Sequence, residues 1–445
     1  MSSKPAILGG QPVFDRPFAP YLTIGEEERI AVQKVMEKGS LSGFIGAWVP
    51  EFYGGDKVKE LEENWRERFG VKHAVAVNSA TSGLYAAVGA LGIEPGDEVI
   101  VTPTTMTASV TGIVLYNAIP VFADICPHTF CLDPDKVEAL ISDRTRAIIG
   151  VNIYGESAHW DRLRAIASKH GLKLIEDAAQ SIGGQYNGKD SGTSGDIGVY
   201  SLNRHKHVHC GEGGVCVTND DELAERLRLI RNHGEAVVEE KGEDNIVNII
   251  GFNYRMTELE AAVAVEQLKK LDAFVEKRRS VSRAIIEAFK PIEGVIPPVE
   301  TGEARPGLCR PSSTNVKHIY YYLCFKLDQD KLGMSRKAFV SAMCQEGVPL
   351  GEGGYRPIYL QPLYQRKIAF GSKGHPFSAA FYGKQIDYSR GLCPIAERMW
   401  FDELFYFKAQ SFVPTQEEIG RITLAAKKVL DHRNEINKLF NENLS

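Results

Sequence analysis

The sequence predicts an α/β protein in which a mainly parallel sheet is covered by helices on both faces. From about residue 71 onward, short apolar segments alternate with segments of helical periodicity, the order typical of strand–helix–strand units. The apolar segments are rich in Val and Ile and alternate little with polar residues, as expected for strands buried on both faces. Ligands of such proteins bind at the carboxyl ends of the strands, so we expect the chemistry there.

These apolar segments predict six strands, at residues 72–77, 98–103, 120–125, 147–154, 173–177 and 197–202. Helices are predicted around them. After Thr81 the apolar residues follow the i, i+3, i+4, i+7 spacing of one helical face. Similar patterns occur at 26–38, 133–141 and 160–170. The last predicted helix begins after Thr415, which forms a capping box with Glu418.

Changes in composition divide the chain into three parts. Residues 1–40 are predicted to be an N-terminal arm and a helix, and residues 41–285 a large domain that contains the sheet. After about residue 285, Pro and Gly cluster at 291–311, and strand-like, helix-like and loop segments follow. Residues 286–445 are therefore expected to form a smaller α+β domain.

The bulk composition argues against several functional classes. Of 445 residues, 43% are hydrophobic and 24% charged, and the formal net charge is -5. This balance gives no reason to expect nucleic acid or an anionic membrane as a partner. No apolar stretch is long enough to span a bilayer, and the N-terminal residues lack the apolar run of a secretory signal. A cytoplasmic location is the simplest expectation.

Cysteines and histidines do not predict a metal site. The eight cysteines lack the close spacing of a zinc clamp or a redox motif and are expected to be free thiols: Cys126, Cys131, Cys210, Cys216, Cys309, Cys324, Cys344 and Cys393. His205, His207 and His209 alternate, so in a strand they would share one face and could bind a metal. We favour the alternative of polar residues lining a loop, because no further ligand is paired with them.

Three clusters of polar residues follow predicted strand ends. The first, residues 78–82, contains Ser79, Ala80 and Thr81 at the start of a helix. Backbone N–H groups and hydroxyls there could bind an anion, although Ser and Thr at a helix start also serve as plain N-caps. In the second, residues 176–180, a buried strand ends in Glu176 and Asp177. Such an acid either pairs with a cation, for example a ring nitrogen, or is solvated.

The third cluster, residues 201–206, ends in Lys206 and is followed by glycines at 211, 213 and 214. A lone Lys is usually a surface residue, but this one follows a buried strand, beside glycines that permit close approach of a ligand. A desolvated lysine has a lowered pKa and attacks carbonyl groups. The order and combination of the three clusters indicate a catalytic site more strongly than any one of them.

In these motifs the chain resembles the DegT–DnrJ–StrS family of sugar aminotransferases, which have the type I fold of pyridoxal 5'-phosphate (PLP) enzymes. The resemblance covers most of the chain and is strongest between residues 70 and 270. It implies that residues 41–285 bind PLP. It also implies that Ser79, Ala80 and Thr81 replace a Ser-Gly-Thr motif that holds the cofactor phosphate. Ser201 would be a further phosphate contact.

The same resemblance assigns roles to the other motif residues. Asp177 would pair with the pyridine nitrogen, Gln180 would meet the 3′ oxygen, and Lys206 would form the Schiff base with the cofactor. Asn253, in the motif at residues 251–256, would reach the phosphate of a neighbouring subunit, which implies a homodimer with a shared active site. Met106 stands where the family stacks an aromatic residue on the ring, and its thioether could pack there instead.

The implied function is amino transfer from glutamate or glutamine to a keto group on a nucleotide-linked deoxysugar or a cyclitol. The opening residues and the segment 354–357 resemble most the branch that acts on cyclitol ketones and aminohydroxybenzoate precursors. Two alternatives stay open, namely other PLP chemistry such as dehydration or cyclisation, and a non-catalytic regulatory relative. The dehydratases of the family have His at the position of Lys206, and a regulatory protein has no need of that lysine.

Overall fold

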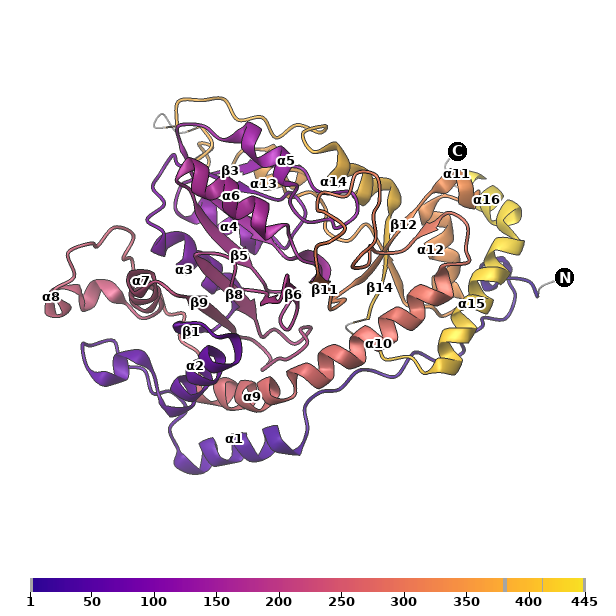
Figure 1. The fold of residues 1–445 in the computed structure, drawn as a ribbon. Helices are drawn as coiled ribbons and strands as arrows, with labels where there is room; N and C mark the ends of the chain where they lie inside the picture. Colours follow the sequence, from indigo (N-terminus) through magenta and orange to yellow (C-terminus); the bar gives the residue numbers. More distant parts are fainter. Residues whose placement is uncertain (1–2, 379–381, 410, 443–445) are drawn as a thin grey trace.

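The computed structural model describes residues 3–378, 382–409 and 411–442. Its centre is a seven-stranded sheet in the order β1-β9-β8-β5-β4-β2-β3 (Figure 1). In that order the strands are His73–Val77, Gly214–Thr218, Ile197–Ser201, Lys173–Asp177, Thr145–Val151, Glu98–Val101 and Ile119–Phe122. The five strands from β8 to β3 are parallel, while β9 is antiparallel to both β8 and β1. The predicted mainly parallel sheet is confirmed, and all six predicted strands are present.

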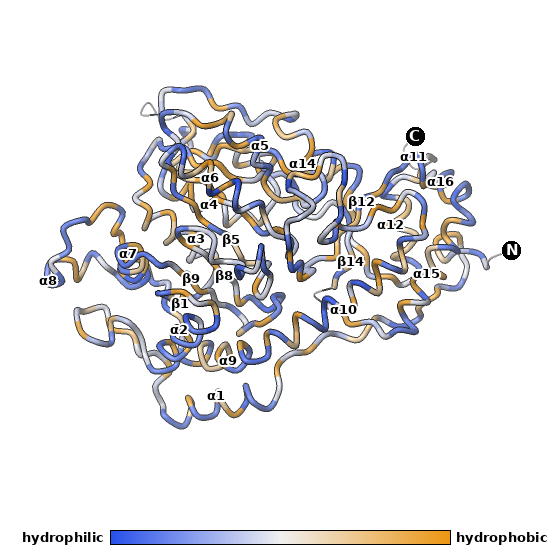
Figure 2. The backbone as a smooth tube through the Cα atoms, in the orientation of Figure 1, coloured by the Kyte–Doolittle hydropathy of each residue, from blue (hydrophilic) through white to orange (hydrophobic). Residues whose placement is uncertain are grey.

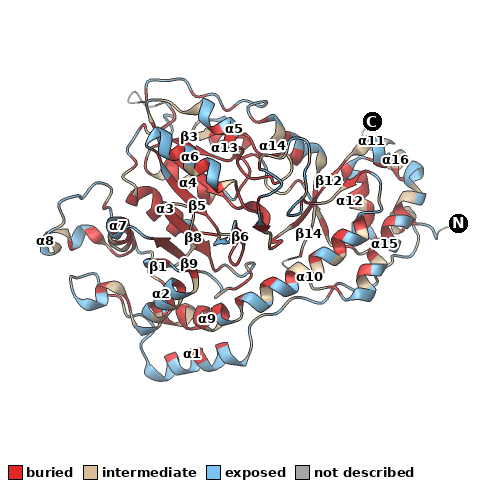
Figure 3. Ribbon diagram, in the orientation of Figure 1, coloured by how far each residue is buried: buried red, intermediate tan, exposed pale blue. Residues whose placement is uncertain are grey.

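The strands are buried on both faces, as predicted. Along β1, Val75 and Val77 belong to one hydrophobic cluster, while Ala74 and Ala76 belong to another. Because successive side chains of a strand point to opposite faces, these two clusters lie on the two sides of the sheet. Figure 3 shows β5, β8 and β9 as buried.

Helices connect the strands and cover the sheet. The predicted helices are present as α1 (Glu26–Lys38), α3 (Ala80–Ala90) and α6 (Trp160–His170), whereas 133–141 forms only a short turn of helix, α5 (Pro134–Val137), and a 3-10 turn. The chain also forms α2, α4, α7, α8 and α9, at Asp56–Phe69, Ala108–Leu115, Asp221–Arg231, Val238–Lys241 and Glu258–Lys269.

A second, antiparallel sheet lies at the other end of the molecule. Its strands, in the order β10-β12-β14-β13, are Val295–Ile296, Leu323–Leu327, Leu404–Phe407 and Leu350–Glu352. The helices α10, α12 and α15 pack on it, at Leu271–Phe289, Arg336–Gln345 and Gln416–Asp431. Apolar and polar residues alternate along α10 and α15, as expected for helices covered on one side (Figure 2).

The capping box before α15 is confirmed, since Thr415 Oγ1 accepts from the backbone N–H of Glu418 and a Glu418 carboxylate oxygen accepts from that of Thr415. This helix is not the last one, because α16 (Arg433–Glu442) follows it. Both termini lie at this end of the molecule (Figure 1). In the described part of the chain, no helix is both long and apolar enough to cross a membrane.

The division at residues 40 and 285 stays a prediction. Two packing features bear on it. The helix α10 runs without interruption across residue 285 and joins the two sheets (Figure 1). Buried side chains between Ile358 and Met399 belong to the same hydrophobic cluster as the large sheet. By this packing, residues 358–378 and 382–399 lie with the large sheet.

Candidate active site

A cavity of about 460 Å³ opens at the carboxyl ends of β5 and β8, where ligands of such sheets bind. Asp177 is the last residue of β5 and Ser201 the last residue of β8. The cavity brings together eight of the nine sequence-predicted site residues, namely Ser79, Ala80, Thr81, Met106, Asp177, Gln180, Ser201 and Lys206. The ninth, Asn253, does not line it.

The first turn of α3 forms one end of the cavity. Ser79 is the N-cap, and its Oγ accepts from the N–H of Ser82 at 3.1 Å. Ser79 therefore does act as a helix N-cap. The next two residues, Ala80 and Thr81, line the cavity, so their backbone N–H groups are available to a ligand there. Gly214 of β9 packs so closely that a Cβ there would lie 2.7 Å from the Ala80 nitrogen. This helix start is suited to an anionic group such as a phosphate.

Asp177 places a buried carboxylate at the bottom of the cavity. Its Oδ2 accepts from Ser109 Oγ at 2.6 Å, and its Oδ1 accepts from the N–H of Ala179 at 3.0 Å. Burial raises the pKa of this carboxyl above its ordinary value, although the two hydrogen bonds and the charge of Lys206 oppose the rise. A buried carboxylate without a directly bonded cation is suited to pair with the protonated ring nitrogen of PLP.

Lys206 lies in the connection between β8 and β9, where its N–H donates to the carbonyl of Asn203. Its Nζ lies 4.4 Å from the centroid of the Tyr321 ring. Burial lowers the pKa of Lys206 to about 8, against the opposing attraction of Asp177. At neutral to mildly basic pH a substantial fraction of this amine is therefore neutral and able to attack a carbonyl carbon.

Gln180 is held in a fixed orientation. Its Oε1 accepts from the N–H of Tyr154 at 2.8 Å, and its Nε2 donates to the Tyr355 hydroxyl at 3.2 Å. Tyr154 has a left-handed backbone conformation, with φ of 59°, which directs its N–H toward the glutamine. The amide nitrogen of Gln180 is thereby placed as a donor at the cavity.

The tyrosines of the cavity wall, and the polar residues Glu212 and Ser109, were not predicted from the sequence. Tyr321, Tyr322 and Tyr355 come from segments more than a hundred residues after the strand-end motifs, and Glu212 lies at the rim. Ser109, which donates to Asp177, is on α4. No spacing in the sequence connects these positions to the motifs. The only available signal was the resemblance of segment 354–357 to one branch of the family, which carries no residue roles.

Asn253 is exposed and lies beside the cavity without entering it. Its carbonyl accepts from Asn78 Nδ2 at 3.3 Å, next to the start of α3. Its side-chain Oδ1 accepts from Arg255 Nε at 2.8 Å. The role of Asn253 in a neighbouring subunit stays a prediction, as does the packing of Met106, which is 56% exposed, on a cofactor ring.

The three alternating histidines point to different partners. His205 lines the cavity, His207 is buried and its Nε2 donates to the carbonyl of Ile319, and the Nε2 of His209 lies 3.0 Å from Thr23 Oγ1. Within the described residues, no group of His, Cys, Asp or Glu side chains could hold a metal ion. The eight cysteines are free thiols, as predicted.

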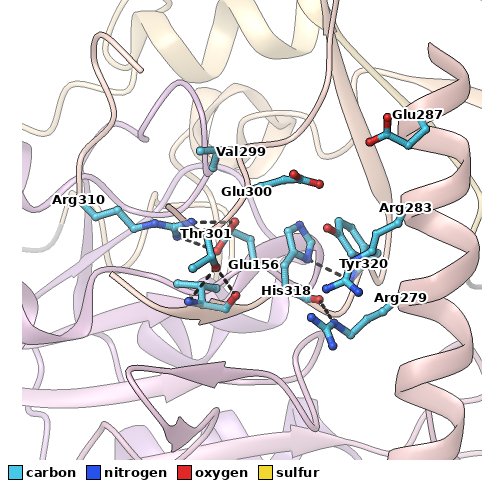
Figure 4. A pocket seen from close by; sticks show the side chains of 11 residues that line it. Glu156, Arg279, Arg283, Glu287, Val299, Glu300, Thr301, Arg310, His318 and Tyr320 are labelled. Atoms are coloured by element: carbon cyan, nitrogen blue, oxygen red, sulfur yellow. Dashed lines mark hydrogen bonds and ion pairs between the residues drawn. The ribbon is translucent and has the colours of Figure 1, made fainter. Parts of the chain in front are cut away.

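A second cavity, of about 530 Å³, lies between α10 and the segments around residues 300 and 318 (Figure 4). Three arginines line it. Arg310 forms a buried ion pair with Glu156 at 2.7 Å, and Arg279 Nε donates to the carbonyl of His318. The third is Arg283. The two cavities share no lining residue, and the chain at residues 318–322 separates them, with Tyr320 facing one and Tyr321 the other.

Known proteins are similar to this chain, some of them over nearly its whole length. A model of the DegT/DnrJ/EryC1/StrS aminotransferase family matches residues 24–388. The putative L-glutamine:3-amino-2,3-dideoxy-scyllo-inosose aminotransferase of Micromonospora echinospora is 32% identical, over 98% of this chain and 100% of its own. GDP-perosamine synthase of Caulobacter vibrioides is 42% identical over 51% of this chain and 60% of its own. The crystal structure of DesI in the presence of its TDP-sugar product superimposes with a TM-score of 0.77 at 26% identity, covering 99% of both chains.

Proposed function

We propose, from the premise that the chain belongs to the DegT/DnrJ/EryC1/StrS aminotransferase family, that it moves an amino group from glutamine or glutamate to the ketone of a sugar or cyclitol. The fold is that of the type I PLP-dependent aminotransferases. The observation that carries the proposal is the meeting of a buried carboxylate, Asp177, with a lysine of lowered pKa, Lys206, in one cavity. The matching family and the relative from Micromonospora echinospora are both named as aminotransferases, which favours amino transfer over dehydration or a regulatory role.

PLP, when bound, supplies an electron sink for the carbanion that forms when a proton leaves the donor carbon. The residues of this chain would position it and handle protons. The start of α3, with Ser79 and Thr81, and the Ser201 hydroxyl would hold its phosphate. Asp177 would keep a proton on the ring nitrogen through a charge-assisted hydrogen bond. Gln180 would donate to the oxygen on the ring.

Lys206 would act twice, first as the covalent anchor and then as a base and acid. Once released from the anchoring role, its neutral Nζ would accept the proton that leaves the donor carbon and would hold it for return during the transfer. In the net reaction, the donor gives its amino group and its Cα hydrogen to the acceptor. The acceptor gives its carbonyl oxygen to the donor in return. The donor leaves as a 2-oxo acid, so the reaction needs no external oxidant or reductant.

A shared active site is the second part of the proposal. Two exposed apolar side chains are connected to the position of Asn253, namely Ile250, three residues before it, and Ile45, with exposed fractions of 64% and 50%. Ile45 joins this face because its carbonyl accepts from Asn232, which bridges to Asn253. Clustered apolar exposure of this kind is typical of an interface. A second copy seated here would cover the apolar face and bring its Asn253 toward the phosphate end of the cavity.

The reaction type is tested by the absorbance of the holoenzyme. L-Glutamine or L-glutamate alone should convert the bound cofactor from its aldehyde to its amine form, with release of the 2-oxo acid. A keto sugar or cyclitol ketone should then reverse the change. If no amino donor converts the cofactor, the aminotransferase proposal is wrong. A cytoplasmic location stays a prediction.

A further inference from the structure

Two cysteines outside the cofactor cavity lie side by side, although they are far apart in the sequence. Cys126 follows β3, and Cys309 lies in the segment that connects β10 to β11 (Val316–Lys317). The N–H of Cys309 donates to Cys126 Sγ at 3.3 Å. Both thiols donate to the carbonyl of Gly307, at 3.9 Å from Cys126 and 3.7 Å from Cys309. The two sulfur atoms therefore converge on one point, and neither cysteine lines the cofactor cavity.

The two thiols differ in exposure, and this difference sets the order in which they can react. Cys126 is buried, with 1% of its surface exposed, whereas Cys309 is partly exposed. A small reagent in the solvent therefore meets the sulfur of Cys309 first. The buried sulfur of Cys126 is then placed to attack the product at Cys309. An accessible cysteine beside a second, resolving cysteine is typical of reversible redox sites.

The contact between the thiols also helps the pair to lose one proton. A hydrogen bond from Cys309 lowers the pKa of Cys126, against the opposing effect of burial. The pKa of Cys309 is raised because its thiol gives that hydrogen bond, because it is desolvated, and because the charges of Cys126 and Asp133 lie beside it. Burial raises the pKa of the neighbouring Cys131. Since a thiolate is the form that attacks a disulfide, the pair is more reactive than an isolated buried thiol such as Cys131.

A bond between these two sulfur atoms would join the two sheets of the molecule. Cys126 belongs to the chain that leaves the large sheet after β3, while the segment of Cys309 begins at β10, which pairs with β12 in the second sheet. The next residue, Arg310, already holds this segment through its buried ion pair with Glu156 at 2.7 Å. Because the two cysteines are in contact, rotation of the Cys309 side chain can bring the sulfurs together with little movement of the backbone.

We propose that Cys126 and Cys309 form a reversible disulfide in the presence of a small disulfide such as oxidised glutathione, and that this bond clamps the segment between β10 and β11 to the large sheet. The Cys309 thiolate attacks one sulfur of the reagent, whose S–S bond breaks, and one half of the reagent leaves as a thiolate and takes up a proton. The Cys126 thiolate then attacks the Cys309 sulfur and displaces the second half in the same way. In total the two cysteines lose two hydrogens, and one molecule of oxidised glutathione becomes two thiols.

Peptide mapping of the oxidised holoenzyme tests the bond directly. The holoenzyme is incubated with oxidised glutathione, its remaining thiols are alkylated, and it is digested without reduction. We expect a linked pair of peptides from one chain that contains Cys126 and Cys309, and its loss after treatment with dithiothreitol. A link between other cysteines, mixed disulfides alone, a link between two copies of the chain, or no oxidation would each overturn the proposal.

Thermal unfolding of the oxidised and reduced holoenzyme tests the clamp. A link between residues so far apart in the sequence restricts the unfolded chain, so oxidation should raise the Tm of the wild type by several degrees. Cys309→Ser should abolish this shift, because it removes the accessible thiol and leaves the buried Cys126 in place. The matched control is Cys344→Ser, which removes an exposed thiol that donates to the Leu350 carbonyl and should leave the shift unchanged. A shift that persists in Cys309→Ser, or a linked wild type whose Tm does not rise, would overturn the clamp.

Discussion

At the residue scale, the neutral fraction of Lys206 controls capture of the cofactor. Its pKa is lowered to about 8 by burial, so the neutral amine becomes the main form as pH rises through 8. We expect the rate at which the apoprotein forms its covalent link to PLP to rise with pH and to level off above about 8. Absorbance of the linked cofactor measures this rate. An inflection near 10.5, the ordinary value for lysine, would contradict the desolvated environment.

The Asp177 carboxylate should matter for chemistry more than for cofactor binding. Asp177→Asn removes the charge that keeps the ring nitrogen protonated, and we expect kcat to fall by about 10²–10³-fold, the range for losing one preorganised electrostatic partner. Ser109→Ala removes only a hydrogen bond to the carboxylate and should cost about tenfold. Single-turnover kinetics with glutamine compare the two variants. Equal losses would show that Asp177 acts only through its packing.

The site residues that could be predicted from sequence are those that follow strand ends. Ser79, Asp177 and Lys206 stand directly after apolar segments, and the parallel sheet brings those ends to one edge. Tyr321, Tyr322 and Tyr355 could not be predicted in this way. These tyrosines lie in segments next to strands of the second sheet, and they reach the cavity only because the two sheets pack together. The local periodicity of the sequence does not predict that packing.

At the scale of single elements, the contact between β9 and α3 should set the position of the phosphate-binding turn. Gly214→Ala would place a Cβ 2.7 Å from the Ala80 nitrogen, so the helix start must shift away from the strand. We expect the Kd for PLP to rise by about tenfold or more, since displaced N–H groups bind the phosphate less well. The control is Gly420→Ala in α15, which meets no atom within 4 Å. Unchanged PLP affinity in Gly214→Ala would contradict the assigned phosphate site.

β9 is the strand of the seven-stranded sheet that was not predicted from the sequence. Its first residue is Gly214, and the glycines at 211 and 213 precede it, so the segment resembles a turn beside the lysine. The strand is nevertheless fully buried between β1 and β8. Position 214 requires glycine because the start of α3 lies too close to leave room for a side chain. This contact is between residues far apart in the sequence, so the local sequence does not reveal it.

At the scale of the whole molecule, the apolar face around Asn253 predicts an obligate dimer. Ile250→Asp replaces an exposed apolar side chain close to Asn253 with a charge and should shift the protein toward monomer in sedimentation velocity, with loss of activity. Asn253→Ala should keep the dimer and weaken PLP retention. A wild-type monomer with full activity would refute the shared site.

The arrangement of the molecule also explains why the domain boundaries are hard to predict. Composition changes near residue 286, yet α10 crosses that point, and residues 358–378 and 382–399 pack with the large sheet. When a domain is built from two separate segments of the chain, no single boundary exists that the composition could locate.

Under the proposed function, Lys206 is the residue that binds PLP covalently, and borohydride reduction of the holoenzyme can show which lysine holds the cofactor. Reduction fixes the cofactor to its lysine, and peptide mass mapping then identifies that lysine. We predict a single labelled peptide that contains Lys206, and a folded Lys206→Ala variant that takes no label. Label on another lysine, or a wild-type protein that takes none, would show that Lys206 is not the residue that binds the cofactor.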